Sequence, residues 1–380
     1  SVSHDFILKK LKEKFGINGL MLRFIKSYLQ GRQQEVVIGG VKSGVLPVKS
    51  GVPQGSILGP LLFVIFINDM FKCISENTNI ALYADDTKIW REINYSEDHF
   101  ILQGDIDKLS EWSYSNKMKF HPSKCKALSV TNQRNILHNL PCTIFNYKLG
   151  SVFINYVQSQ VDLGVTVTNK LLWTNHCDKL AKNANSKLAL LMRTCHFSTN
   201  KKQKRAFYLT VIRSIFEHCS IIWHPVSSNQ LYKFDALQKK AVKWINGQPF
   251  IHYTEMQYLA KLKELSILPI KSKFALNDLI LFFKIMNCLV PIKLPEHFTV
   301  IKPKDVRLTR KTATILEDKD TTSIKCSIKP LCDSFKNCFF HRTMILWNKI
   351  PYSIRQQSAI TKFKSQVTKF LLSADLDWPD

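Results

Sequence analysis

The sequence predicts an α+β fold, with short strands and helices alternating over the first part of the chain and helices dominating the rest. Residues 79–82, expected to be a short buried strand, and residues 87–90, expected to be a second strand, carry β-branched and aromatic side chains and flank a polar centre, which is typical of a β-hairpin. From Leu180 onward, apolar residues recur at helical spacing. Apolar residues make up 45% of the 380 residues, which predicts a large core and two or three domains.

The charge balance favours an anionic partner. Lys and Arg number 54 and Asp and Glu number 29, which gives a net charge of +25. Because no amphipathic basic helix stands out, nucleic acid is favoured over a membrane surface. The longest apolar run, residues 57–67, is too short to span a bilayer and contains Gly59 and Pro60. We therefore expect no membrane partner.

Ten cysteines are scattered along the chain without a Cys-x-x-Cys pair, and no signal peptide opens it. This pattern indicates reduced thiols in an intracellular protein. Three cysteines and a histidine cluster near the end of the chain, but their spacing is too long for a typical zinc site, so a structural role is expected. These residues are Cys326, Cys332, Cys338 and His341. Because the chain begins at Ser1 rather than Met, we expect it to be a fragment.

Apolar spacing and turn residues predict the elements in order. Residues 1–29 are expected to be helical with a break at Gly16, and residues 33–48 alternate apolar and polar side chains as a hairpin does. Further segments are expected to be a buried helix over 61–70, a helix over 96–114, a strand over 127–130, and helices over 207–223, 231–245 and 274–289. The charged, proline-containing segment 291–320 is expected to be a linker.

The tip of the central hairpin, Tyr83-Ala84-Asp85-Asp86, carries two adjacent carboxylates. Their mutual repulsion is costly unless a cation lies between them or solvent screens them. Mg²⁺ prefers carboxylate and phosphate oxygens, so the pair could hold metal ions for phosphoryl transfer. The alternative is an ordinary turn, because aspartate side chains also bond to nearby backbone amides.

A glycine-rich loop, residues 50–60, lies upstream of this hairpin. Gly51, Gly55 and Gly59 allow close approach of the backbone, and Pro53 and Pro60 stiffen the loop. Gln54 can bond in two directions through its amide. Such a loop suits a surface over which a base pair slides, and the alternative is a long turn that precedes a helix.

The loop and the Asp-Asp tip, in this order and at this separation, resemble the signature of reverse transcriptases of non-LTR (LINE-type, jockey/CR1-like) retrotransposons. The resemblance implies a partial right-hand polymerase palm without fingers over residues 1–170 and an α-helical thumb over residues 171–248. A basic helical C-terminal region of unknown role would follow over residues 249–380, and the segment around Trp347 resembles the tail of such reading frames.

The resemblance also implies roles for individual residues. Asp85 and Asp86 would hold Mg²⁺ (or Mn²⁺), with Asp85 the more direct ligand. The nucleotide and template would contact Gly51, Pro53, Gln54, Gly55, Tyr83 and Ala84. Lys124 would protonate the leaving pyrophosphate, although a solvated basic loop is an equal alternative. Leu163 and Gly164 would form a hairpin that grips the primer, with a plain strand as the alternative.

The implied function is RNA-directed DNA polymerisation on an RNA template, from a DNA primer in target DNA, with deoxynucleoside triphosphates, in the nucleus. In the family a Val-x-His segment like Val2-Ser3-His4 follows the motif Asp-x-x-Lys-Ala-Phe-Asp, whose first aspartate is the third catalytic carboxylate. That motif is absent from these residues, so the polypeptide alone is expected to be inactive. His4 and His176 are given no catalytic role.

Two alternatives remain open at the level of the sequence. The first is a non-catalytic nucleic-acid-binding remnant of a decayed element. The second is a reverse transcriptase of the group II intron type. The basic segment from Asn200 to Arg205 begins a helix and could contact phosphates, or it could be a solvated helix end.

Overall fold

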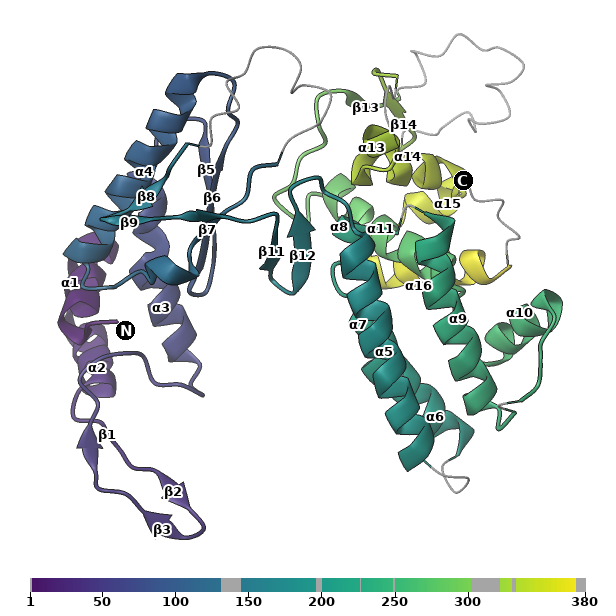
Figure 1. Ribbon diagram of the computed structural model, residues 1–380, viewed down its shortest axis with the longest axis horizontal. Helices are drawn as coiled ribbons and strands as arrows, with labels where there is room; N and C mark the ends of the chain where they lie inside the picture. Colours follow the sequence, from purple (N-terminus) through teal and green to yellow (C-terminus); the bar gives the residue numbers. More distant parts are fainter. Residues whose placement is uncertain are drawn as a thin grey trace. The chain divides into compact units, whose positions relative to one another are not determined.

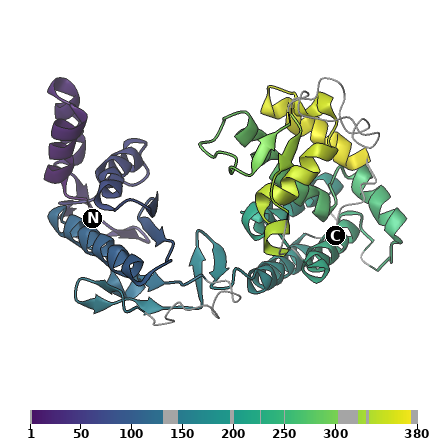
Figure 2. The same ribbon diagram turned by 90° about the horizontal axis from the view of Figure 1, so that it is seen from above.

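The computed structural model describes residues 2–130, 145–195, 200–225, 227–248, 250–301, 322–329 and 333–373 (Figures 1 and 2). The chain divides into two compact units. The first unit holds Ser1–Gln160 and Thr168–Lys170, and the second holds Val161–Val167 and Leu171–Asp380. Both units mix helices and strands, so the predicted α+β class is confirmed at this level. Among the described residues no helix is both long and apolar enough to cross a membrane.

Four α-helices and a 3₁₀ helix build the core of the first unit. They are α1 (His4–Phe15), α2 (Gly19–Leu29), α3 (Leu58–Ile67), the 3₁₀ helix η1 (Asn68–Cys73) and α4 (Ser96–Ser115). The expected break falls at Gly16, whose left-handed φ of 65° lets its N–H close α1 on the carbonyl of Leu11. Ile7, Leu29 and Phe66 are fully buried where these helices meet.

Helix α3 differs from the expected helix over 61–70 in two respects. It begins three residues earlier, at Leu58, so Gly59 and Pro60 lie in its first turn, where proline is tolerated. It is also only half buried, because Leu61 and Val64 are about half exposed. Apolar composition alone therefore overstated its burial.

The strands of the first unit form short pairs. The expected hairpin over 33–48 is present as two antiparallel pairs, and the expected strand over 127–130 shrinks to two residues that pair in parallel with a later strand. The strands are β1 (Gln33–Gln34), β2 (Val37–Ile38), β3 (Val41–Lys42), β4 (Leu46–Pro47), β5 (Thr78–Tyr83), β6 (Asp86–Arg91), β7 (Lys126–Ala127), β8 (Lys148–Leu149), β9 (Val152–Phe153) and β10 (Asn155–Tyr156). Antiparallel pairs also join β5 to β6 and β8 to β9.

A hairpin whose residues 161–167 belong to the second unit precedes a group of helices. The hairpin pairs β11 (Ser159–Asp162) with β12 (Val165–Thr168). The helices that follow are α5 (Thr174–Thr194), α6 (Lys201–Phe207), the π-helix η4 (Tyr208–Arg213), α7 (Ser214–Glu217), α8 (Ser220–Trp223) and α9 (Ser228–Ile245). As expected, Asn200 begins α6: its side chain accepts a hydrogen bond from the N–H of Gln203 at 2.9 Å. The single helix expected over 207–223 is wrong, because Cys219 takes a left-handed φ of 52° between α7 and α8.

The rest of the second unit continues the same core. Its elements are α10 (Glu255–Glu264), α11 (Ile270–Met286), β13 (Phe298–Val300), β14 (Ile324–Cys326), α13 (Asp333–Lys336), α14 (Phe339–Lys349), α15 (Tyr352–Arg355) and α16 (Ile360–Ser373). Helix α11 serves two hydrophobic clusters, with Phe274 in the first and Phe282 in the second. Because both clusters share α11, the ranges expected to be thumb and C-terminal region pack together in one unit.

Part of the expected linker over 291–320 is ordered structure. Strand β13 falls inside that range and pairs antiparallel with β14, with Thr299 opposite Lys325. Residues 302–320 of the expected linker lie outside the described residues, and so does Cys332 of the cysteine cluster. Within the described ranges, no group of three His, Cys, Asp or Glu side chains is placed to hold a metal ion.

Candidate active site in the first unit

The Asp-Asp tip is a two-residue turn between β5 and β6. Tyr83 pairs with Asp86, so Ala84 and Asp85 form the turn, and Ala84 takes a left-handed φ of 50° that is uncommon outside glycine. Tyr83, Asp85 and Asp86 are exposed. Within the part of the chain that the structure describes, neither carboxylate has an ion-pair partner, although the chain carries 54 Lys and Arg residues. Both are therefore free to bind a cation.

Some other acidic residues of this unit are paired with cations, and Asp69 is the clearest example. Asp69 accepts hydrogen bonds from Lys10 at 2.9 Å and from the indole N–H of Trp112 at 2.9 Å, and it also pairs with Lys14. Burial acts to raise the pKa of Asp69, but hydrogen bonds from Lys14, Lys10 and Trp112 outweigh it and hold this pKa below its ordinary value. Asp69 therefore holds helices together, whereas Asp85 and Asp86 have no ion-pair partner among the described residues and lie side by side.

Apolar side chains on the inner face of the hairpin pack against α3 and η1 and fix the position of the hairpin. Ile80, Leu82 and Ile89 contact the core that contains Phe66 and Met70. The expectation of a buried strand before the tip is corrected here, because β5 alternates half-buried and exposed residues and so presents only one face to the core. The tip is thus an exposed end of a well-anchored hairpin.

The start of the glycine-rich loop is pinned to the beginning of the chain. The N–H of Gly51 donates to the carbonyl of Val2 at 2.7 Å, and the ring Nε2 of His4 donates to the carbonyl of Gly51 at 2.8 Å. Gly51 has a φ of 94°, which L side chains rarely adopt, so glycine is required here. Val52 packs against the same core as the hairpin.

The end of the loop is organised by Ser56. Its hydroxyl donates to the carbonyl of Pro53 at 2.7 Å and accepts hydrogen bonds from the N–H of Gly59 at 3.0 Å and from the hydroxyl of Tyr28 at 2.5 Å. One donor and two acceptors is the full capacity of a hydroxyl. A Cβ on Gly59 would lie 2.4 Å from the oxygen of Pro53, which explains the glycine there.

Between these two ends, the loop exposes Gln54 and Gly55. Among the described residues, neither the amide of Gln54 nor the backbone of Gly55 has a hydrogen-bonding partner. Gly55 takes a φ of 74°, and Pro53 just before it is half buried. The loop therefore has fixed ends and a polar apex that is open to a ligand.

Lys124 and the predicted primer-gripping hairpin belong to other elements of the chain. Lys124 is exposed at the end of the 3₁₀ helix η2 (Pro122–Lys124). Leu163 and Gly164 form a two-residue turn in which both φ angles are positive, 45° and 85°, and they belong to the second unit. There the ring Nε2 of His218 donates to the carbonyl of Leu163 at 3.0 Å.

The structure also identifies residues that the sequence did not mark. His4, Tyr28 and Ser56 support the loop, and His218 supports the turn at Leu163. His4 gives no local signal because its partner lies 47 residues away, and the partner of Tyr28 lies 28 residues away. Only the fold brings these side chains to the predicted motifs.

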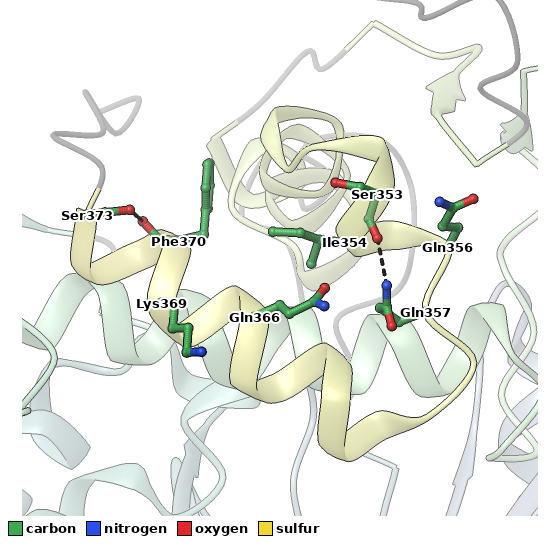
Figure 3. Close-up of a pocket in the computed structure, with 8 residues that line it drawn as sticks. All are labelled: Ser353, Ile354, Gln356, Gln357, Gln366, Lys369, Phe370 and Ser373. Atoms are coloured by element: carbon green, nitrogen blue, oxygen red, sulfur yellow. Dashed lines mark hydrogen bonds between the residues drawn. The ribbon is translucent and has the colours of Figure 1, made fainter.

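A shallow groove of about 610 Å³ between α15 and α16 is lined by none of the predicted site residues (Figure 3). Gln366, Lys369 and Phe370 line it from α16. On the side of α15, the amide of Gln357 donates to the carbonyl of Ser353 at 2.8 Å. The residues that line this groove include neither a carboxylate, as at the Asp-Asp tip, nor a glycine, as in the glycine-rich loop.

Comparison with known proteins supports the same region. Residues 1–167 match the family described as reverse transcriptase (RNA-dependent DNA polymerase). The RNA-directed DNA polymerase from mobile element jockey of Drosophila melanogaster is 26% identical over 263 residues, which are 66% of this chain and 27% of that protein. Its counterpart from Drosophila funebris is also 26% identical, over 265 residues, with the same coverage of both chains.

A probable RNA-directed DNA polymerase from transposon BS of Drosophila melanogaster is 25% identical over 262 residues, which are 66% of this chain and 28% of that protein. The chain thus spans about a quarter of the length of these curated relatives. The matched range contains both the glycine-rich loop and the Asp-Asp tip. The resemblance to non-LTR retrotransposon polymerases is confirmed: residues 1–167 match the reverse transcriptase (RNA-dependent DNA polymerase) family, and about two thirds of the chain is similar to RNA-directed DNA polymerases of mobile elements.

Proposed function

We propose that this chain is part of an RNA-directed DNA polymerase that adds deoxynucleotides to the 3′-hydroxyl of a DNA primer on an RNA template. The observation that carries the proposal is the tip of the β5–β6 hairpin. There Asp85 and Asp86 are exposed and without ion-pair partners among the described residues, within the range that matches the reverse transcriptase family. Adjacent free carboxylates in so basic a chain are the donor set that a hard divalent cation prefers.

In this proposal Asp85 and Asp86 hold Mg²⁺ or Mn²⁺, with Asp85 the more direct ligand. When bound, the metal would activate the primer 3′-hydroxyl and stabilise the leaving pyrophosphate. The two carboxylates leave coordination positions for water and substrate phosphates, since no third acidic or histidine ligand joins them among the described residues.

The remaining predicted residues bind and orient the substrates. Gln54 and Gly55 at the loop apex, with Gly51 and Pro53 below them, would contact the incoming nucleotide and the template, as would Tyr83 and Ala84. Lys124 would donate a proton to pyrophosphate as it leaves. Leu163 and Gly164 would hold the primer end. Residues 1–170 would then be the partial palm, residues 171–248 the thumb, and target DNA in the nucleus the source of the primer.

Manganese binding tests the metal site directly. We expect Asp85→Asn and Asp86→Asn, separately and together, to weaken Mn²⁺ binding to the chain with primer–template and nucleotide by about tenfold or more, because each removes a charged oxygen ligand. Electron paramagnetic resonance of Mn²⁺ measures the affinity. Glu111→Gln, at an exposed acid on α4, is the matched control and should bind as the wild type does. Equal binding by the Asp85 and Asp86 variants would overturn the proposal.

Primer extension tests the activity of these residues alone. The motif Asp-x-x-Lys-Ala-Phe-Asp, which in the family supplies the third carboxylate, does not occur among the 380 residues. We therefore expect a polypeptide of these residues to bind primer–template but not to extend it with Mg²⁺ and an RNA template. Robust extension would show that two carboxylates suffice and would contradict this part of the proposal.

A further inference from the structure

We propose that His4 and Tyr28 are positioning residues that hold the two ends of the nucleotide loop, residues 50–60, and so place Gln54 and Gly55 against the incoming nucleotide. Neither residue belongs to the loop: His4 begins α1, and Tyr28 lies near the end of α2 (both helices are purple in Figure 1). The inference rests on the proposed polymerase function and adds to it two side chains whose hydrogen bonds fix the position of the loop.

His4 fixes the first end. Its side chain is buried, with 8% of the residue exposed, and its Nε2 lies 2.8 Å from the carbonyl oxygen of Gly51. That oxygen can only accept, so Nε2 must carry the proton, which is true of one neutral tautomer and of the imidazolium. The backbone N–H of Gly51 is also bound, because it donates to the carbonyl of Val2. Next to it, Ser3 forms an antiparallel β-bridge with Ser50. Gly51 therefore has both of its backbone groups bound to residues 2–4.

Tyr28 fixes the second end. Its hydroxyl donates to the hydroxyl of Ser56, which in turn donates to the carbonyl of Pro53 and accepts from the N–H of Gly59. Because the donor of Ser56 is used on Pro53, Tyr28 and Gly59 take its two acceptor positions. Tyr28 thus orients a hydroxyl that ties the middle of the loop to the first turn of α3.

These two attachments leave little freedom at the apex. Only Val52 and Pro53 separate Gly51 from Gln54, and Gly55 immediately precedes Ser56. A residue spans at most about 3.6 Å of chain, so such short arms keep the apex close to both attachments. Misplacement of a binding group by about 1 Å can cost about 100-fold in rate. Loss of either attachment should therefore weaken the binding of the incoming nucleotide.

Amide hydrogen exchange tests the attachments without any need for catalysis. We expect His4→Ala to speed exchange of the Gly51 amide and Tyr28→Phe to speed exchange of the Gly59 amide, each by about tenfold or more, since local opening exposes them. His4→Gln keeps a side-chain N–H donor and should restore part of the protection. His252→Ala, at an exposed histidine, is the control and should leave both amides unchanged. Unchanged exchange of Gly51 in His4→Ala would overturn the inference.

Nucleotide binding to the complex of chain and primer–template tests the consequence. We expect His4→Ala and Tyr28→Phe to weaken deoxynucleotide affinity about tenfold while primer–template affinity stays at the wild-type value. His4→Gln should bind nucleotide with the wild-type pH dependence, because the donor N–H is present in both protonation states of histidine. If nucleotide binding by His4→Gln lost part of the wild-type pH dependence, His4 would take part in proton transfer, and this would contradict a positioning role.

The two failures can be told apart. If the wild-type chain binds no primer–template or nucleotide, the proposed function is overturned and the positioning role with it. If the wild-type chain binds both and the variants exchange faster at the loop but bind nucleotide equally well, only the positioning role is overturned.

Discussion

At the residue scale, Arg342 joins three helices of the second unit. Its Nε lies 2.8 Å from Oδ2 of Asp278 on α11, and its Nη2 lies 3.0 Å from Oδ1, which makes a bidentate pair. The same guanidinium donates to the carbonyls of Ile221 on α8 at 2.6 Å and Asn337 at 2.7 Å. Asp278 is fully buried, so this pair lies where an unpaired charge would be costly.

The pair should make stability depend on pH in a defined direction. Burial raises the pKa of Asp278 to about 6 from an ordinary value of 3.8, although Arg342 acts to lower it. A raised folded-state pKa contributes stability that is fully present below about pH 4 and is lost as pH rises through 6. Nearby His224 has a pKa that burial lowers to about 3, so it stays neutral in this window.

We expect Arg342→Met to destabilise the protein more at pH 8 than at pH 5. Without the arginine, the pKa of Asp278 rises further, so the aspartate is neutral at pH 5, whereas at pH 8 the folded protein must either bury an unpaired anion or keep the carboxyl protonated against the solution pH, and both cost stability. The loss should reach about 3–5 kcal/mol at pH 8 and be smaller at pH 5. Denaturant unfolding, followed by fluorescence at both pH values, measures it.

Arg205→Met is the matched control for this prediction. Among the described residues, Arg205 donates only to the backbone carbonyls of Leu265 and Ser266, at 2.5 Å and 3.1 Å, so its removal leaves no carboxylate there without a partner. Its loss should be the same at both pH values. A pH-independent loss for Arg342→Met would show that the carbonyl contacts, rather than Asp278, account for the stability that Arg342 provides.

At the scale of elements, the first turn of α3 depends on the absence of a side chain at Gly59. A Cβ there would lie 2.4 Å from the oxygen of Pro53 and 2.9 Å from Oγ of Ser56. We expect Gly59→Ala to destabilise the first unit by roughly 1–3 kcal/mol, because the loop must shift to admit the methyl group. Thermal unfolding followed by circular dichroism measures the change.

Gly104→Ala, in the same unit, is expected to change stability in the opposite direction. Gly104 lies inside α4 with no atom within 4 Å of the position of an added Cβ. Alanine there should stabilise by about 0.5–1 kcal/mol through helix propensity. If both alanine variants changed stability in the same direction, steric conflict at Gly59 would not be the cause of its effect.

Element by element, the sequence predicted what local patterns encode. Helical spacing located α2, α4 and α9 closely, and the two runs around Asp85 located β5 and β6. The break at Cys219 gave no signal, because a left-handed φ at a cysteine is imposed by packing rather than by residue type. Strand β13 was hidden for another reason: it pairs with β14, about two dozen residues away, across charged sequence.

The same distinction applies to the candidate site. Asp85, Gly51 and Gln54 could be marked from sequence because adjacency and residue type carry their chemistry. His4 could not, because a histidine that begins a helix carries no local signal of a bond to a loop 47 residues away. The contacts of such supporting residues form only in the folded protein, so they are seen in the three-dimensional structure and not in the local sequence.

At the scale of the whole molecule, the excess of positive charge predicts salt-dependent binding of nucleic acid. The net charge is +25, and proteins that contact the phosphate backbone release counterions, so the logarithm of affinity falls linearly with the logarithm of salt concentration. Lysines already paired with carboxylates contribute less than free ones. Helices α5 and α9 offer both kinds, which allows a comparison within one unit.

We expect the double variant Lys182→Gln with Lys187→Gln to lose about two phosphate contacts. The slope of the logarithm of affinity against the logarithm of salt concentration should then become shallower by about 0.9 for each lost contact. Both lysines are exposed on α5 and have no ion-pair partner among the described residues. The paired variant Lys233→Gln with Lys239→Gln should change the slope less, because Lys233 pairs with Asp178 and Lys239 pairs with Asp235 and Glu255. Fluorescence anisotropy with a labelled RNA–DNA duplex at several salt concentrations measures the slopes. A wild-type slope for the Lys182→Gln and Lys187→Gln double variant would mean that the free charge on α5 does not contact the duplex and would contradict the prediction.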